Sequence, residues 1–150
     1  MVKMSSWASA VGVAVTFVWL GMVLAISFLE APLKFRAAGV TLPIGLAIGR
    51  LVFRGLNAAE VVLGLAVVVA MVGGGVGAGG YPAAAAVCSV AAVVALVAQL
   101  VAVRPFLHRR TAAVLAGHTG QRSRAHLAYI ALEGCKVLAL LGAGIALLTA

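Results

Sequence analysis

Residues 61–103 read VVLGLAVVVAMVGGGVGAGGYPAAAAVCSVAAVVALVAQLVAV and contain no charged side chain. A helix needs about 20 residues to cross the roughly 30 Å hydrocarbon core of a bilayer, so this stretch is too long for one span. The glycines within residues 73–80 and the pair Tyr81-Pro82 interrupt it, because glycine and proline end helices. The stretch therefore predicts two antiparallel membrane helices joined by a short glycine-rich turn.

The composition of the whole chain also indicates a lipid environment. Hydrophobic residues make up 65% of the 150 residues and charged residues only 9%, whereas a soluble domain carries about 25% charged residues. A chain with so few polar groups cannot cover its surface in water. This excludes a soluble enzyme, a secreted disulfide scaffold and a disordered tail, and the length predicts a single domain.

The remaining spans follow from the same length argument. Residues 4–29 carry no charge and predict a first helix. Only about twelve apolar residues separate Glu60 from the glycines, which is too few to cross a bilayer. The second span must therefore include Glu60, and for the same reason the last must include Glu133 and Lys136. The sequence predicts an all-α polytopic membrane protein whose four transmembrane helices lie at about 6–29, 50–72, 82–103 and 125–149.

The basic residues, which give the chain a net charge of +8, fall between the apolar spans. The first connection and its helix ends hold Lys34, Arg36, Arg50 and Arg54, and the third holds Arg104, Arg109, Arg110, Arg122 and Arg124. The positive-inside rule predicts that both connections are cytoplasmic and both termini outside, in a multi-pass protein of the cell membrane. Trp7 and Tyr81 would then be aromatic residues at the outer interface. This placement of charge argues against a nucleic-acid partner.

The chain also suggests a two-fold repeat of a helical hairpin. A shift of 73 residues superimposes Pro32 on Pro105 and Glu60 on Glu133 without a gap. In both halves, a helix that ends at the proline is followed by basic residues and by a returning helix that carries the glutamate. Two spans per repeat would give parallel repeats about an axis along the membrane normal. The alternative, that short membrane hairpins resemble one another by chance, remains open.

Polar residues gather on one face of the second span and on one face of the fourth. At about 100° per residue, the first set falls within about 120° and the second within about 80°. The sets are Arg50, Arg54, Asn57 and Glu60, and Arg122, His126, Tyr129, Glu133 and Lys136. Ionisable residues at membrane depth are costly and indicate a functional site by default. All of these residues except Arg122 are candidates for a pocket that binds or transports an ion, a proton or a small polar solute.

An assembly role explains the same stripes. Glu133 with Lys136, and Glu60 with Arg54 or Lys136, would neutralise one another and fix the register of the helices. The protein would then be a homo-oligomer or an accessory subunit of a larger membrane complex. Basic residues near one membrane face would also suit anionic lipid headgroups, and the candidates are Arg104, Arg109, Arg110, Arg122 and Arg124.

A metal or catalytic centre has less support from the sequence. The three histidines have no i, i+4 spacing to one another, and the chain has no aspartate with which to complete a Ser-His-Asp triad. Cys88 and Cys135 lie in apolar stretches without a CxxC motif, which is typical of buried free cysteines. We therefore assign no metal ligand and no catalytic residue, and the cofactor is undetermined.

Several short motifs resemble those of a known family. They are Ala31-Pro32-Leu33-Lys34-Phe35, Gly45 and Gly49 with Arg50 and Phe53, Arg104-Pro105, and His126 at the start of the last helix. In these the chain resembles the transmembrane protein 205-like family, from about residue 18 to 148. The resemblance implies four helices and a membrane location, and it supplies no reaction.

A second likeness concerns the second span alone. Arg54, Asn57 and Glu60 are similar to the Arg, Asn and Glu that help to bind glutathione in the membrane-associated eicosanoid and glutathione metabolism proteins, which are four-helix trimers. This likeness adds a glutathione-type membrane enzyme as a third class of function, beside the transport-type and accessory roles.

Overall fold

The computed structural model describes residues 3–77, 79–106, 109 and 124–150. Over these ranges the chain is almost entirely helical, with one isolated β-bridge between Val76 and Tyr81 and no strand. Four helical segments are long and apolar enough to cross a membrane, namely Trp7–Arg36, Leu42–Gly74, Ala83–Phe106 and Leu127–Leu148. The predicted all-α fold with four membrane-spanning helices is confirmed for the part of the chain described.

Two of the four segments change their helical type along their length. The first contains α1 (Lys3–Val23), the π-helix η1 (Leu24–Glu30), α2 (Ala31–Leu33) and the 3-10 turn η2 (Lys34–Arg36). The second is the single helix α3 (Leu42–Gly74). The third contains α4 (Ala83–Ala98) and the π-helix η3 (Gln99–Val103). The last is α6 (Arg124–Leu148).

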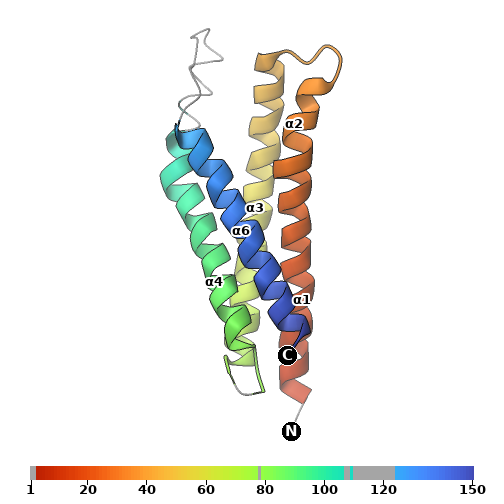
Figure 1. The fold of residues 1–150 in the computed structure, drawn as a ribbon, viewed down its shortest axis with the longest axis vertical. Coiled ribbons are helices and arrows are strands. Elements are labelled where there is room, and N and C mark those ends of the chain that lie inside the picture. The colour runs from red at the N-terminus through yellow and green to blue at the C-terminus, as the bar shows by residue number, and fades with distance from the viewer. Residues whose placement is uncertain (1–2, 78, 107–108, 110–123) are drawn as a thin grey trace.

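The four segments form two hairpins that pack side by side. Helix α1 packs against α3, α4 packs against α6, and α1 and α6 contact each other between the hairpins. Figure 1 shows the N-terminal end of α1, the turn of residues 75–82 and the C-terminal end of α6 at one end of the bundle. The connection of residues 37–41 lies at the opposite end, which we call the basic end.

Pro32 and Pro105 do not end the first and third spans, contrary to the sequence expectation. The helical segments continue through Pro32 to Arg36 and through Pro105 to Phe106. Proline lacks an N–H and clashes with the carbonyl four residues earlier, so a wider turn is needed before it. The π-helices η1 and η3 each end two residues before these prolines. The two halves of the predicted repeat therefore share a structural feature as well as two residues.

The first connection is also shorter than predicted. Helix α3 begins at Leu42, rather than at about residue 50, with Thr41 in an extended conformation before it. Pro43 lies in the first turn of the helix, where its missing N–H removes no hydrogen bond and its fixed φ suits the helix. Arg50, predicted at the start of the second span, therefore lies two turns inside α3, and Lys34 lies in the 3-10 turn η2.

The glycine-rich turn forms where the sequence predicted it. Gly75, Gly77 and Gly79 adopt positive φ angles of 67°, 112° and 81°, which only glycine adopts readily. The Tyr81 N–H donates to the Gly75 carbonyl at 2.6 Å, and the Gly77 N–H donates to the Tyr81 carbonyl at 3.0 Å. These bonds reverse the chain between α3 and α4.

Tyr81 is a core residue instead of an exposed interfacial one. Its side chain is 0% exposed, and its hydroxyl is 3.1 Å from the Ser89 hydroxyl. The ring lies against Gly12 of α1 and near Leu147 of α6, because Gly12 has no Cβ to exclude it. Trp7, by contrast, is 43% exposed and agrees with an interfacial position.

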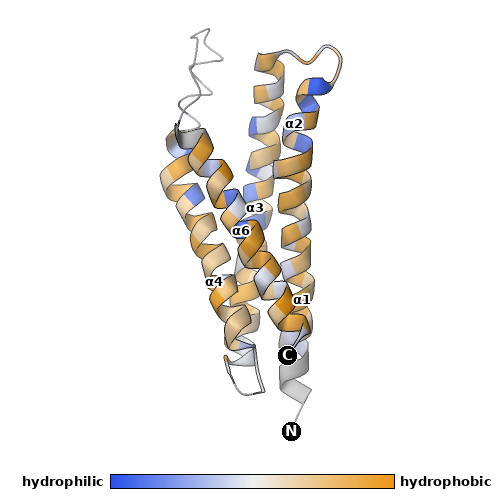
Figure 2. Cartoon of the chain, viewed as in Figure 1, coloured by the Kyte–Doolittle hydropathy of each residue, from blue (hydrophilic) through white to orange (hydrophobic). Residues whose placement is uncertain are grey.

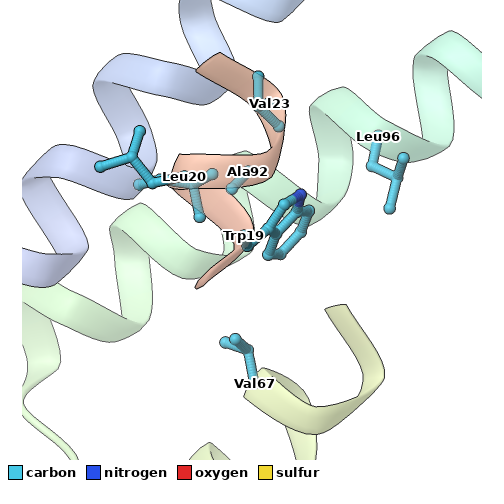
Figure 3. Packing of buried hydrophobic residues seen from close by; sticks show 7 residues of the cluster. Trp19, Leu20, Val23, Val67, Ala92 and Leu96 are labelled. Atoms are coloured by element: carbon cyan, nitrogen blue, oxygen red, sulfur yellow. The ribbon is translucent and has the colours of Figure 1, made fainter. Parts of the chain in front are cut away.

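The apolar core lies between the four helices. Trp19 is fully buried and packs with residues of every span (Figure 3), namely Leu20, Val23, Val67, Ala92, Leu96 and Leu140. A second cluster, formed by Ala70, Tyr81, Ala85, Ala86 and Leu147, lies closer to the glycine-rich turn. Hydrophilic residues gather between the bundle centre and the basic end, as Figure 2 shows. The other half of the bundle is mostly apolar, and its buried polar side chains include Thr16 and Ser89.

Candidate functional site

A buried ion-pair cluster lies near the middle of the bundle. Lys136 of α6 donates from Nζ to Glu60 Oε1 at 2.5 Å and to Gln99 Oε1 at 2.7 Å. Its Nζ is also 3.4 Å from Glu133 Oε1, one helical turn away. All four residues are 1% exposed or less. The inner ends of the two stripes therefore face protein and meet at Lys136, whereas Arg50 and Arg54 at the outer end of the α3 stripe are exposed.

Two residues of this cluster were missed by the sequence analysis. The indole N–H of Trp19 on α1 donates to Glu60 Oε1 at 2.9 Å, and Gln99 accepts from Lys136. The cluster thus connects α1, α3, η3 and α6. A weak signal for Gln99 exists, since it is the only carboxamide within residues 61–103. A single polar residue on an apolar helix forms no periodic pattern, however, so Gln99 could not be assigned to a polar face. Trp19 could not be assigned either, because a tryptophan is equally typical of an apolar core.

The charges of the cluster do not balance when every group is ionised. Glu60 and Glu133 contribute two carboxylates, while Lys136 contributes one ammonium group. Both Glu60 Oε2 and Glu133 Oε2 are buried without a hydrogen-bond partner among the described residues. A buried acceptor or charge without a partner is costly. These two carboxylate oxygens are such acceptors, and a hydrogen-bond donor placed beside them would lower that cost.

A cavity of about 590 Å³ opens beside the cluster, between the two hairpins and toward the basic end. It is formed by the segment around Ala31, the first half of α3 and the first half of α6. Its cationic lining residues are Lys34, Arg50, Arg54 and Arg104, and its other polar ones are Ser27, Asn57, Tyr129 and Glu133. The volume lies within the range of about 300–1,000 Å³ that is typical of small-molecule sites.

Small and aromatic residues shape the wall of this cavity. A Cβ at Gly45 would overlap the Phe35 ring, and one at Gly49 would overlap the end of Lys34. The Lys34 ammonium lies 5.4 Å from the centre of the Phe53 ring and forms an ion pair with Glu30 at 3.2 Å. Phe53 in turn meets Tyr129 edge to face at 5.7 Å between centroids. These contacts connect the wall of the first hairpin to α6.

The predicted single pocket is therefore two neighbouring sites. Arg50, Arg54, Asn57, Tyr129 and Glu133 line the cavity, whereas Glu60 and Lys136 do not and are sealed inside the cluster. Trp19 and Gln99, which bond to the cluster, account for this separation.

Glu133 belongs to both sites. Its Oε1 lies near Lys136, and its Oε2 has no partner among the described residues. The Asn57 Oδ1 and the Tyr129 hydroxyl are likewise buried and unpartnered there. All three side chains border the cavity. The cavity floor thus holds polar atoms that the described part of the protein leaves unbonded.

The other predicted residues divide into three groups. Arg104 lines the cavity and Arg109 is exposed. Arg124 and His126 lie on α6, but their side chains are outside the described part, and Arg110 and Arg122 are outside it entirely. Within the described residues, no group of three His, Cys, Asp or Glu side chains is arranged to hold a metal ion.

Comparison with known proteins gives no indication of function, so the function has to be inferred from the geometry of the site. No protein-family model, no curated protein and no solved structure matches the chain. The resemblance to transmembrane protein 205-like proteins rests on the short motifs alone.

Proposed function

We propose that this protein binds a small polar solute in the cavity between its two hairpins and acts in a transport-type role. One observation carries the proposal: the cavity floor holds buried polar atoms that lack a partner among the described residues, namely Asn57 Oδ1 and Glu133 Oε2. Buried polar atoms without a partner cost free energy, and the cavity beside them has room for a molecule that bonds to them. A solute that bonds to them would recover that cost.

The closed side of the cavity supports a role in binding from one membrane face. Beyond the floor lie the sealed cluster and the apolar core around Trp19. These layers separate the cavity from the end of the bundle that carries the glycine-rich turn. A transport cycle would require the two hairpins to move relative to each other, and the cavity lies at the boundary between them.

The assembly role is less well supported than binding. The pairs Lys136–Glu60 and Lys136–Glu133 form within one chain, as the assembly interpretation expects, and they account for the sealed cluster. They do not account for the open cavity beside it, which is what favours binding. The glutathione-type role has Arg54 and Asn57 in the cavity but Glu60 sealed away from it, which separates the three residues on which that likeness rests.

The test is a matched pair of tryptophan substitutions on α3. Leu46 lines the cavity, whereas Leu51 is 68% exposed on the outside of the same helix. A panel of amino acids, carboxylates and phosphorylated amines is added to the purified protein in an uncharged detergent, and the midpoint of thermal unfolding is measured. A solute at 100 times its Kd stabilises the folded state by about 2.7 kcal/mol.

We expect at least one solute to raise the midpoint for the unmodified protein and for Leu51→Trp, and to have no effect on Leu46→Trp. A solute found this way is then tested for uptake into vesicles that contain the protein. Failure of every solute to raise the midpoint, or equal stabilisation of both variants, would contradict binding in the cavity. Binding without uptake would contradict the transport role alone.

A further inference from the structure

The cavity has two chemically different ends. Arg50 and Arg54 lie one turn apart on α3, so both project from the same face. Neither has a hydrogen-bond or ion-pair partner among the described residues. Two unpaired guanidinium groups in one cavity form a site for a carboxylate or a phosphate, which arginine binds through paired hydrogen bonds.

The opposite end, at the floor, needs hydrogen-bond donors. The unpartnered atoms Asn57 Oδ1 and Glu133 Oε2 are acceptors, on side chains that are 5% and 1% exposed. Glu133 also belongs to a cluster with two carboxylates and one ammonium group. An ammonium group, which donates up to three hydrogen bonds, therefore complements these acceptors better than a hydroxyl, which donates one.

The distance between the two ends of the cavity limits the size of a ligand that can bind to both. With a rise of about 1.5 Å per residue, Arg54 lies about 4.5 Å and Arg50 about 10.5 Å along α3 from Asn57. The walls between them carry the apolar side chains Phe28, Phe53 and Ile130. The matching molecule has an anion and a cation a few ångströms apart, joined by a short apolar linker.

We propose, on the basis of the proposed binding function, that the ligand is a zwitterion whose phosphate or carboxylate binds Arg50 and Arg54 and whose primary ammonium group binds Glu133 and Asn57. A free solute and the headgroup of an aminophospholipid both present this chemistry. The primary ammonium group is the decisive element, since a quaternary one has no N–H to donate to the unpartnered acceptors.

The test compares four probes on the purified protein in an uncharged detergent, at constant ionic strength. They are O-phosphoethanolamine, O-phosphocholine, ethyl phosphate and ethanolamine, and the affinity of each is obtained from thermal unfolding as a function of probe concentration. We expect phosphoethanolamine to bind at least tenfold more tightly than phosphocholine, which has the same anion without the N–H donors. Ethyl phosphate and ethanolamine each supply one half and should bind more weakly still.

Variants assign the two halves of the ligand to the two ends of the cavity. Arg54→Gln should weaken phosphoethanolamine and phosphocholine by similar factors. Glu133→Gln should remove the preference for phosphoethanolamine, and Asn57→Leu, which leaves the ion-pair cluster intact, should reduce it. Arg36→Gln is the matched control, because Arg36 is exposed and does not line the cavity, and it should change neither affinity.

A second experiment, in lipid nanodiscs, distinguishes a lipid headgroup from a free solute as the source of the ligand. The ligand is a lipid headgroup if phosphatidylethanolamine stabilises the protein more than phosphatidylcholine does and the variants show the same pattern. In that case the free probes should have no effect. Binding of free phosphoethanolamine identifies a soluble zwitterion.

Two results would overturn the inference. One is equal binding of phosphoethanolamine and phosphocholine with no effect of Glu133→Gln or Asn57→Leu, which leaves cavity binding in place but removes the zwitterion. The other is a lack of response to every probe in both arms. The proposed function fails separately, when no member of the wider panel distinguishes Leu46→Trp from Leu51→Trp.

Discussion

At the scale of single residues, Lys136 is the centre of the polar interior. It is 0% exposed and contacts the side chains of Glu60, Gln99 and Glu133. Its removal would leave two buried carboxylates without a cation, and breaking a buried pair in this way costs about 3–5 kcal/mol. We expect Lys136→Met to lower the free energy of unfolding by that amount, measured by denaturant titration in detergent.

The matched control is the second Lys–Glu pair of the described chain. Lys34 and Glu30 lie one turn apart near the basic end, and their side chains are 10% and 31% exposed. Lys34→Met leaves a single, partly exposed carboxylate, so it should cost less than Lys136→Met. Combining Lys136→Met with Glu60→Gln and Glu133→Gln should restore most of the lost stability, because it removes the uncompensated charge. A triple variant as unstable as Lys136→Met alone would show that shape, rather than charge, is what Lys136 supplies.

Residue patterns predicted part of this arrangement and could not predict the rest. The 3.6-residue period placed Glu60 on one face of its helix and Glu133 with Lys136 on one face of theirs, since that period is local. Whether those faces are sealed or open depends on neighbours from other helices, here Trp19 and Gln99. The division of one predicted pocket into a sealed cluster and an open cavity is therefore a property of packing between helices.

At the scale of elements, the helices approach closely where glycine faces a neighbour. Hydrophobic driving force between helices is weak in lipid, so packing and small residues dominate their association. A Cβ at Gly12 of α1 would lie 2.9 Å from the Tyr81 ring, whereas one at Gly21 of the same helix would meet nothing within 4 Å. The sequence gives both positions the same residue type and the same apolar context.

These two glycines provide a prediction with its own control. Gly12→Ile forces the side chain into the Tyr81 ring and should destabilise the protein by about 1–3 kcal/mol, the usual cost of overpacking. Gly21→Ile extends into open space on the outside of the bundle and should change stability by less than about 0.5 kcal/mol. Thermal unfolding of both variants in the same detergent measures the difference. Equal destabilisation would mean that α1 does not pack as described.

The π-helices show a further limit of prediction at this scale. Proline at positions 32 and 105 is a sound signal for a helix end, because it removes a hydrogen bond and clashes with the preceding turn. Here the π-helices η1 and η3 precede the two prolines, and the helical segments do not end at them. The first span continues to Arg36. The hydrophobic length of the spans could be predicted from composition, while the local helix type depends on how the widened turn packs.

At the scale of the whole molecule, charge is distributed unequally between the two ends of the bundle. The turn of residues 75–82 carries no charged residue, whereas the 37–41 connection follows Lys34 and Arg36 directly. Each basic residue near an anionic membrane surface contributes about 1 kcal/mol of attraction. From this asymmetry and the positive-inside rule, we predict that the basic end, and with it the cavity, faces the cytoplasm.

This orientation is testable with single cysteines at the two ends. In a background of Cys88→Ala and Cys135→Ala, the cysteine of Val76→Cys would lie in the glycine-rich turn and that of Ala38→Cys in the connection at the basic end, both exposed positions. A membrane-impermeant maleimide should label Val76→Cys in intact cells, and should label Ala38→Cys only after the membrane is made permeable. The reverse pattern would place the cavity on the outer face and make its solute an external one, because the apolar half of the bundle closes the other route.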